Sequence, residues 1–218
     1  MAKRRLLLLL KPFDMYPVGQ HFCQSRITNP KIFQFLDNRR KVHKEAVNFC
    51  QSILQRKAVD WEPVLRANLS QPIHNFDFVV TVGGDGTLLK ASHFMDDSIP
   101  VLGVNSDPTK VEEVEEFGDD FDATRSTGYL CAATMNNFEQ VLDDILDGRK
   151  QPSELLRMSI RGTMKPDEAM EMTWSSEKGF LYIDGSNVVH SIQYGDTIQT
   201  SVAAPHLKVF LPDRLESS

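Results

Sequence analysis

The stretch that most constrains the fold runs from Asp77 to Phe94 and reads DFVVTVGGDGTLLKASHF. The run Phe78–Val82 is typical of a buried strand, because it is apolar apart from one β-branched threonine. Three glycines that enclose Asp85 follow at once, and a helical pattern begins at Thr87. A strand that turns through glycines directly into a helix is the building unit of a parallel α/β sheet.

The chemistry of this turn sets a carboxylate against a backbone suited to anions. Glycine lets a ligand approach the main chain closely, and the N–H groups at the start of a helix attract anions. Thr87 is a candidate to cap the helix. The backbone can therefore hold phosphates, whereas Asp85 must do something else. It can take a proton from an attacking hydroxyl, hold Mg²⁺ between phosphates, or bind a ribose hydroxyl.

Other phosphate-binding motifs do not fit the turn. A P-loop requires a Gly-Lys pair, and none occurs in the chain. A dinucleotide-binding fingerprint requires a third glycine where Leu89 stands. The alternative without a ligand is a plain strand–turn–helix junction whose glycines only make the turn.

The rest of the first half follows the same alternation of strands and helices. Leu6–Leu10 and Ile99–Asn105 are expected to be buried parallel strands, and the leucine run is too short for a secretory signal. A helix is expected after Asn29-Pro30, and an amphipathic one over Asn137–Gly148. We therefore predict an α/β domain with a parallel sheet over residues 1–150.

Two charged stretches within this half are interpreted as solvated surface. The basic run Arg39–Lys41 is assigned to the outer face of the helix after Asn29. The acidic stretch VEEVEEFGDDFD, residues 111–122, is expected to be a surface loop.

The pattern changes beyond Pro166. Short runs rich in β-branched and aromatic residues, such as GFLYIDG and NVVHSIQYGD, are separated by turn-like Gly and Asp residues. Residues 151–218 are therefore predicted to form a β-rich unit.

The composition limits the classes of function. The chain has 218 residues, a formal net charge of −6 and a pI near 5.5, which argues against a general nucleic-acid or membrane-surface binder. Cys23, Cys50 and Cys131 show no CxxC spacing, so neither a disulfide framework nor a zinc site is expected. These features favour the cytoplasm, with the peroxisome and the mitochondrion as alternatives.

The sequence resembles the NAD kinase family. TVGGDGTLLKASHF is similar to the GGDGT motif of that family, which diacylglycerol and sphingosine lipid kinases share more loosely. Two further segments, Pro100–Thr109 and Arg125–Thr134, resemble those that follow GGDGT in the NADH-preferring plant members and the mitochondrial members. A lipid kinase would not carry these two segments, so it is the weaker alternative.

The resemblance implies a reaction and a fold. NAD kinases transfer the γ-phosphate of ATP, with Mg²⁺ or a similar cation, to the 2′-hydroxyl of the adenosine ribose of NAD⁺ or NADH, and so make NADP(H). Their fold is an α/β domain followed by a β-rich domain, with the site between the two. The implied partners are small-molecule nucleotides, without nucleic acid or membrane, and the full-length form is implied to be a homodimer.

The resemblance also implies roles for particular residues. Asp85 matches the aspartate that activates the acceptor hydroxyl. The residues implied to bind the nucleotide are Gly84, Gly86 and Thr87 of the phosphate-facing turn, with Asn105 and Asp107 of the following segment.

The chain departs from the family in its second half. No asparagine is followed by Asp or Glu, and no Gly-Ser-Thr occurs, so the family's ribose-gripping pair and its nucleotide-lining segment are absent. A large middle block of the β-rich domain is missing around Arg161–Thr163, through splicing, mis-annotation or a natural compact variant. We therefore expect little or no kinase activity and poor stability, because closing strands that contain Phe180, Val189 and Val209-Phe210 lose their partners. A non-catalytic nucleotide-binding or dimer-forming protein is the alternative.

Overall fold

A computed structural model describes residues 3–13, 29–155, 169–183, 188–201 and 207–213. The junction expected around Arg161–Thr163 lies outside these residues. The first part of the chain contains β1 (Arg4–Leu10), α1 (Pro30–Arg56), β2 (Val59–Leu65), a short 3₁₀ turn η2 (Arg66–Asn68), β3 (Phe78–Gly83), α2 (Asp85–Ser92), β4 (Val101–Asn105), α3 (Val111–Phe117), β5 (Ala133–Thr134) and α4 (Phe138–Leu146). The second part contains β6 (Ser153–Leu155), β7 (Ala169–Thr173), β8 (Lys178–Ile183), β9 (Val188–Gln193), β10 (Thr197–Ser201) and β11 (Leu207–Phe210).

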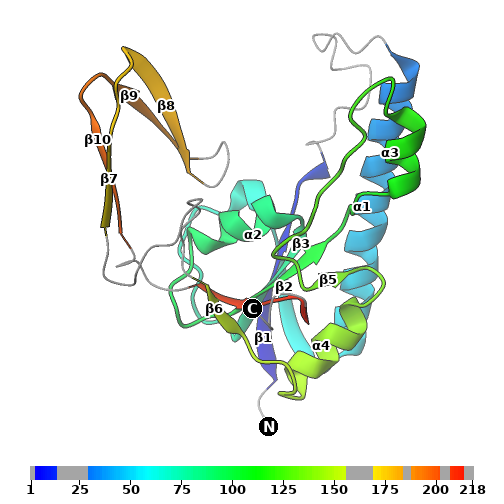
Figure 1. Cartoon of the computed structure of the whole chain (residues 1–218). Coiled ribbons are helices and arrows are strands. Elements are labelled where there is room, and N and C mark those ends of the chain that lie inside the picture. The colour runs from blue at the N-terminus through cyan, green and yellow to red at the C-terminus, as the bar shows by residue number, and fades with distance from the viewer. Residues whose placement is uncertain (1–2, 14–28, 156–168, 184–187, 202–206, 214–218) are drawn as a thin grey trace.

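A seven-stranded sheet carries the fold, with the order β2-β1-β3-β4-β11-β6 and with β5 paired to β4 (Figure 1). All of its pairs are parallel except that of β6 with β11. The leucine run explains the central position of β1, because Leu6, Leu8 and Leu10 pack into the core on one face, whereas Leu7 and Leu9 pack on the other. The predicted α/β fold class is thus confirmed.

Helices cover both faces of this sheet. The core on one face includes residues of α1 and α4, and the core on the other face includes Leu88 and Ala91 of α2. The expected start of α1 is confirmed, since the Asn29 side chain accepts a hydrogen bond from the Lys31 N–H and Pro30 opens the helix. Within the described part of the chain, no helix is long and apolar enough to cross a membrane.

Two strands from beyond residue 150 join this sheet. β11 pairs with β4, and β6 pairs with β11, so the division expected near residue 150 does not divide the sheet. Val209 and Phe210 were expected to be left open, and this was wrong, because both are buried and Phe210 lies edge-on to Phe78 at a centroid distance of 6.5 Å. The sequence pattern of a short apolar strand does not show which sheet the strand joins.

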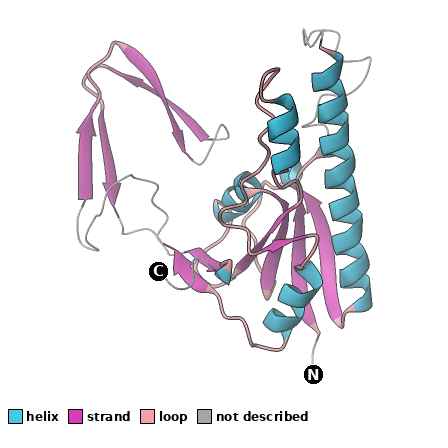
Figure 2. Ribbon diagram, turned by 45° about the vertical axis from the view of Figure 1, so that its right-hand side comes forward, coloured by secondary structure: helices cyan, strands magenta, loops and turns pink. Residues whose placement is uncertain are grey.

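The remaining strands form two two-stranded sheets, β7 with β10 and β8 with β9. Both lie apart from the seven-stranded sheet in Figures 1 and 2. As expected from the loss of partners, Phe180 and Val189 are exposed, by 64% and 42%. Trp174 packs against Gly179, where a side chain would collide with the indole ring.

Two local expectations were incomplete. The acidic stretch is in part a helix, α3, and its Phe117 and Phe121 stack on each other and pack beside Phe35 of α1. These aromatic residues hold the stretch on the protein, which a count of its charges does not show. The edge strand β2 was not predicted, because VDWEPVL alternates poorly and contains a proline.

The position of β11 gives a prediction on stability. Phe210→Ala should lower the free energy of unfolding by about 3–5 kcal/mol, because it empties a buried site against Phe78. The matched control Phe180→Ala should change it by less than about 0.5 kcal/mol, since that ring is exposed. Urea unfolding of the two variants measures both values, and equal losses would contradict the assignment of β11 to the core.

Candidate functional site

The predicted site lies where the central strands have their carboxyl ends. β3 ends at Gly83 and β4 at Asn105, and Lys11 directly follows β1. The main chain ties these ends together, because the Lys11 N–H donates to the Val82 carbonyl at 3.0 Å and the Ser106 N–H donates to the Gly83 carbonyl at 2.8 Å. In open α/β sheets, ligands bind at this edge.

The helix after the glycine turn begins one residue beyond Gly84, which is its N-cap. The Gly84 carbonyl accepts from the N–H groups of Thr87 at 2.8 Å and Leu88 at 3.4 Å. The N–H groups of Asp85 and Gly86 are the first two of the helix, so they have no acceptor within it. These two amides suit an anion.

The cap predicted for Thr87 was wrong. Thr87 is the third residue of α2 and is buried, whereas a capping side chain must precede the helix. Its Oγ1 lies under the turn, where a Cβ on Gly83 would collide with it.

The glycines at positions 84 and 86 differ in what surrounds them. A Cβ on Gly84 would collide with Oγ of Ser126, so this glycine allows the loop after α3 to approach the turn. Nothing lies within 4 Å of a Cβ built on Gly86, which is exposed. The fold therefore does not require glycine at 86, and the open space there leaves room for a ligand.

The Asp85 carboxylate is held by the backbone of a distant loop. Its Oδ2 accepts from the Tyr129 N–H at 2.8 Å, and its Oδ1 accepts from the Leu130 N–H at 2.9 Å. The Cys131 thiol lies 3.6 Å from Oδ1. Oδ2 accepts only one of these contacts, so the carboxylate is oriented and keeps an oxygen that can accept a further hydrogen bond.

Asn105 and Asp107 lie beside the turn, in the interior. The Asn105 amide donates to the Ser126 carbonyl at 3.0 Å, and its Oδ1 faces the Asp107 N–H at 3.3 Å. Asp107 is buried and forms ion pairs with Arg39 at 2.8 Å and Arg125 at 2.6 Å. Both side chains thus organise the edge of the sheet, and their contact with a nucleotide stays a prediction.

Arg39 corrects a sequence interpretation. It was assigned to a solvated helix face, but its Nε pairs with the buried Asp107, and its guanidinium lies 5.6 Å from the centre of the Phe35 ring. Arg40 and Lys41 are exposed, as expected.

No sequence pattern indicates a role for His43, which α1 places under the turn. His43 is fully buried, with Nδ1 2.8 Å from Ser106 Oγ and Nε2 2.9 Å from the Lys11 carbonyl oxygen. Ser106 Oγ in turn lies 3.0 Å from the Gly83 carbonyl oxygen. Burial lowers the pKa of His43 below its ordinary value, which favours the neutral imidazole.

Lys11 was also missed, because it stands in the sequence only as the end of a leucine run. Burial and the neighbouring charge of Arg39 lower the pKa of Lys11 to about 8, and Asp107 opposes this shift. Its Cβ lies 3.1 Å from a Cβ built on Gly83. A bound phosphate would favour its charged form, so Lys11 is a candidate to meet an anion at the turn.

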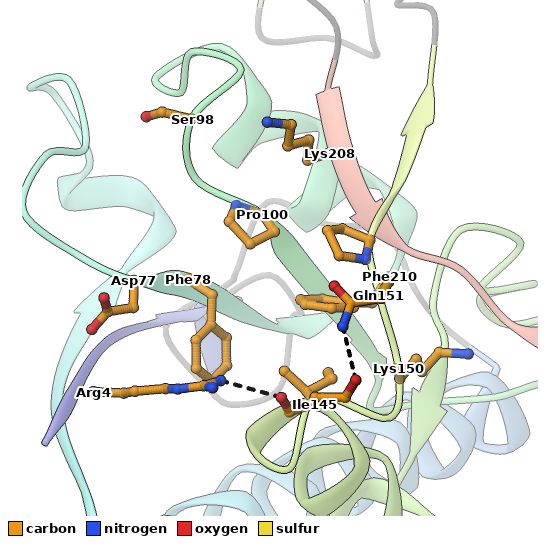
Figure 3. Close-up of a pocket in the computed structure, with 12 residues that line it drawn as sticks. Arg4, Asp77, Phe78, Ser98, Pro100, Ile145, Lys150, Gln151, Lys208 and Phe210 are labelled. Atoms are coloured by element: carbon orange, nitrogen blue, oxygen red, sulfur yellow. Dashed lines mark hydrogen bonds between the residues drawn. The ribbon is translucent and has the colours of Figure 1, made fainter. Parts of the chain in front are cut away.

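A hollow of about 410 Å³ lies at the opposite edge of the sheet (Figure 3). Arg4, Phe78 and Pro100 line it where β1, β3 and β4 begin, and Arg4 donates to the Ile145 carbonyl at 3.2 Å. This end of the strands carries neither Asp85 nor the glycine turn. We therefore place the candidate site at the carboxyl edge and not in this hollow.

The described residues contain no group of three or more His, Cys, Asp or Glu side chains placed to hold a metal ion. Asp85 is the carboxylate of the glycine turn. Mg²⁺ commonly binds through one or two carboxylates together with substrate phosphates, so a cation brought by a nucleotide fits this donor set.

Comparison with known proteins identifies the family of the chain. The profile of the ATP-NAD kinase N-terminal domain matches residues 22–109. An NADH kinase of Arabidopsis thaliana is 42% identical to the chain, over 97% of the chain and 96% of that protein. A probable NADH kinase of Oryza sativa subsp. japonica is 38% identical, over 99% of the chain and 98% of that protein.

The chain belongs to the NAD kinase family. A crystal structure of an NAD kinase from Archaeoglobus fulgidus in complex with ATP is also similar, with 19% identity and a TM-score of 0.41, covering 81% of this chain and 51% of that one. The Arabidopsis alignment extends over 306 positions, whereas the chain has 218 residues, so at least 88 positions have no residue here. This agrees with the missing middle block inferred for this NAD kinase.

Gly84 and Gly86 of the turn give a matched prediction for ATP binding. Gly86→Val should leave the thermal stability unchanged, because space is open there, but weaken ATP binding by at least about tenfold through crowding of the phosphates. Gly84→Ala should lower stability, because its Cβ meets Ser126. Calorimetric titration with ATP and melting curves separate the effects, and unchanged ATP affinity in Gly86→Val would rule out this turn as the phosphate site.

Lys11 gives a prediction on pH. Its pKa is about 8 in the folded chain and near the ordinary 10.5 when unfolded, so the unfolded chain binds more protons in this window. The contribution of Lys11 to the free energy of unfolding should therefore rise between these two pH values. Urea unfolding of the parent and of Lys11→Met across the window measures it, and a difference between the two proteins that does not vary with pH would contradict the shift.

Proposed function

We propose that the chain carries the phosphoryl-transfer site of an NAD(H) kinase. The 2′-hydroxyl oxygen of the adenosine ribose of NADH or NAD⁺ attacks the γ-phosphorus of ATP. A new P–O bond forms, the bond between that phosphorus and the β,γ-bridging oxygen breaks, and ADP leaves. The hydroxyl proton goes to Asp85, and the product is NADP(H).

The position of Asp85 carries this proposal. A carboxylate that only capped a helix would face its own turn, but Asp85 is aimed by two amides of a separate loop. A general base must be fixed within hydrogen-bond reach of the proton that it removes. The grip of the amides of Tyr129 and Leu130 supplies this fixed orientation before a substrate binds.

The surroundings of Asp85 suit the donor nucleotide. The amides of Asp85 and Gly86 at the start of α2, the open space at Gly86 and the side chain of Lys11 would meet ATP phosphates. When bound with ATP, Mg²⁺ would neutralise charge that develops on the phosphoryl oxygens. This division of tasks removes the apparent conflict of a carboxylate in a phosphate-binding turn.

The acceptor side of the site is incomplete by comparison with relatives. At least 88 aligned positions of the Arabidopsis enzyme have no residue here, and the chain lacks an Asn-Asp or Asn-Glu pair and a Gly-Ser-Thr. Correct orientation of two reactants can lower a barrier by about 7–11 kcal/mol. We therefore propose that turnover of this form is low, which makes a nucleotide-binding protein with little catalysis the second candidate.

The proposal also covers the compartment, the ligands and the oligomeric state of the protein. The lack of CxxC spacing among the three cysteines of the sequence, together with the acidic pI, supports a cytoplasmic protein that binds nucleotides and not nucleic acid. The family resemblance supports a homodimer for forms that contain the whole β-rich domain.

The catalytic role of Asp85 gives a direct prediction. Asp85→Asn should lower the rate of NADP(H) formation from ATP, Mg²⁺ and NADH by about 10²–10⁴-fold, because the amide cannot take the proton. Its ATP affinity should change by less than about threefold. The same assay with NAD⁺ and with diacylglycerol as acceptors identifies the substrate class.

The control for this experiment is Asp97→Asn, since Asp97 is an exposed carboxylate beyond the end of α2. It should leave the rate unchanged. If the 218-residue chain turns over too slowly, the pair of substitutions is tested in a chain with the missing block restored. A rate for Asp85→Asn within about threefold of the parent would contradict the assignment of Asp85 as the general base.

A further inference from the structure

A long excursion of the chain leaves the carboxyl edge of the sheet at Asp107 and returns at Arg125. Its two ends are clasped, because Ser126 N–H donates to the Asp107 carbonyl at 3.2 Å and Pro108 forms a parallel bridge with Ser126. The Arg125 N–H also donates to Thr109 Oγ1 at 2.9 Å. The loop that follows the excursion therefore starts from a fixed point.

The side chain of Arg125 closes the clasp from inside the protein. It is fully buried, and its two terminal nitrogens pair with different carboxylates, Asp107 at 2.6 Å and Glu113 of α3. Its guanidinium also lies 5.1 Å from the centre of the Phe35 ring. Removing one partner of a buried ion pair is strongly unfavourable, because the other charge stays desolvated. Arg125 thus connects the excursion, α1 and the sheet edge.

The loop after Arg125 leads directly to Asp85. The Ser126 carbonyl accepts from the Asn105 amide, and Gly128, with φ +62°, packs on that asparagine where a side chain would collide. This left-handed turn points the next two amides, of Tyr129 and Leu130, at the Asp85 carboxylate. The orientation of Asp85 therefore depends on where the loop begins.

We propose that Arg125 is a positioning residue for Asp85, acting through the loop of residues 126–131. Its ion pairs with Asp107 and Glu113 fix the start of the loop, and the loop amides in turn fix the carboxylate. This inference rests on the proposed role of Asp85, but Arg125 itself touches no reacting atom. Loss of the clasp should loosen the loop locally and leave the sheet intact.

Amide hydrogen exchange in the 218-residue chain tests this coupling without any need for turnover. In Arg125→Met, the N–H groups of Tyr129 and Leu130 should exchange at least about tenfold faster than in the parent. Amides of β1 and β3 should change their exchange rates by a smaller factor than these two amides. Arg125→Lys can make one of the two ion pairs, so its exchange rates should fall between those of Arg125→Met and the parent.

Arg39→Met is the matched control, because it removes the other ion pair of Asp107 but leaves Arg125 in place. It should change exchange at Tyr129 and Leu130 by less than about threefold. Parent-like exchange of these amides in folded Arg125→Met would overturn the proposal. An increase in exchange across β1 and β3 equal to that at Tyr129 and Leu130, in both Arg125→Met and Arg125→Lys, would also overturn it. Such a result would show that Arg125 only stabilises the fold in general.

A kinetic measurement separates this proposal from the role of Asp85. In a chain that turns over, Arg125→Met should lower kcat by at least about tenfold while the KM for ATP changes by less than about threefold. If Asp85→Asn proves fully active, the proposed base fails, but faster exchange in Arg125→Met would still establish that Arg125 positions the loop. If exchange responds and kcat does not, the loop is positioned by Arg125 without consequence for catalysis, and the catalytic part of the proposal is overturned.

Discussion

The candidate site depends on the hydrogen bonds that two backbone amides donate to one carboxylate. Tyr129 and Leu130 present their N–H groups to the two oxygens of Asp85 across more than forty residues of sequence. This contact joins the glycine turn to the loop after α3, and it gives the carboxylate hydrogen-bond partners outside α2. Without it, a carboxylate and a phosphate would compete for the same helix start.

The parallel sheet makes that contact possible. Strands β1, β3 and β4 end at one edge, so Lys11, the glycine turn and Asn105 come together although they are far apart in the chain. The strand β11 completes this sheet from the far end of the sequence. In this shortened member of the NAD kinase family, β11 is therefore paired and buried in the α/β part. Strands β7–β10, in contrast, form two small sheets with exposed apolar side chains.

Local sequence predicted much of the fold, because burial on both faces and helix caps leave local patterns. Leu6–Leu10, Asn29-Pro30 and the GGDGT turn were enough to place β1, α1 and the β3–α2 unit. The contacts of Arg125 and His43 could not be predicted in this way, since their partners lie outside the local pattern, 18 residues away for Asp107 from Arg125 and 63 for Ser106 from His43. The cap assigned to Thr87 failed for a related reason: the helix starts two residues earlier than its apolar pattern.

The most direct test of the central claim is a map of where ATP binds to the 218-residue chain. Backbone amide shifts recorded during an ATP titration should change at Gly84–Thr87, at Lys11 and at Tyr129–Cys131. Those at the opposite edge, around Arg4 and Lys208, should stay unchanged. Shifts confined to that opposite edge, or no saturable shifts at the glycine turn, would contradict the assignment of the carboxyl edge as the nucleotide site.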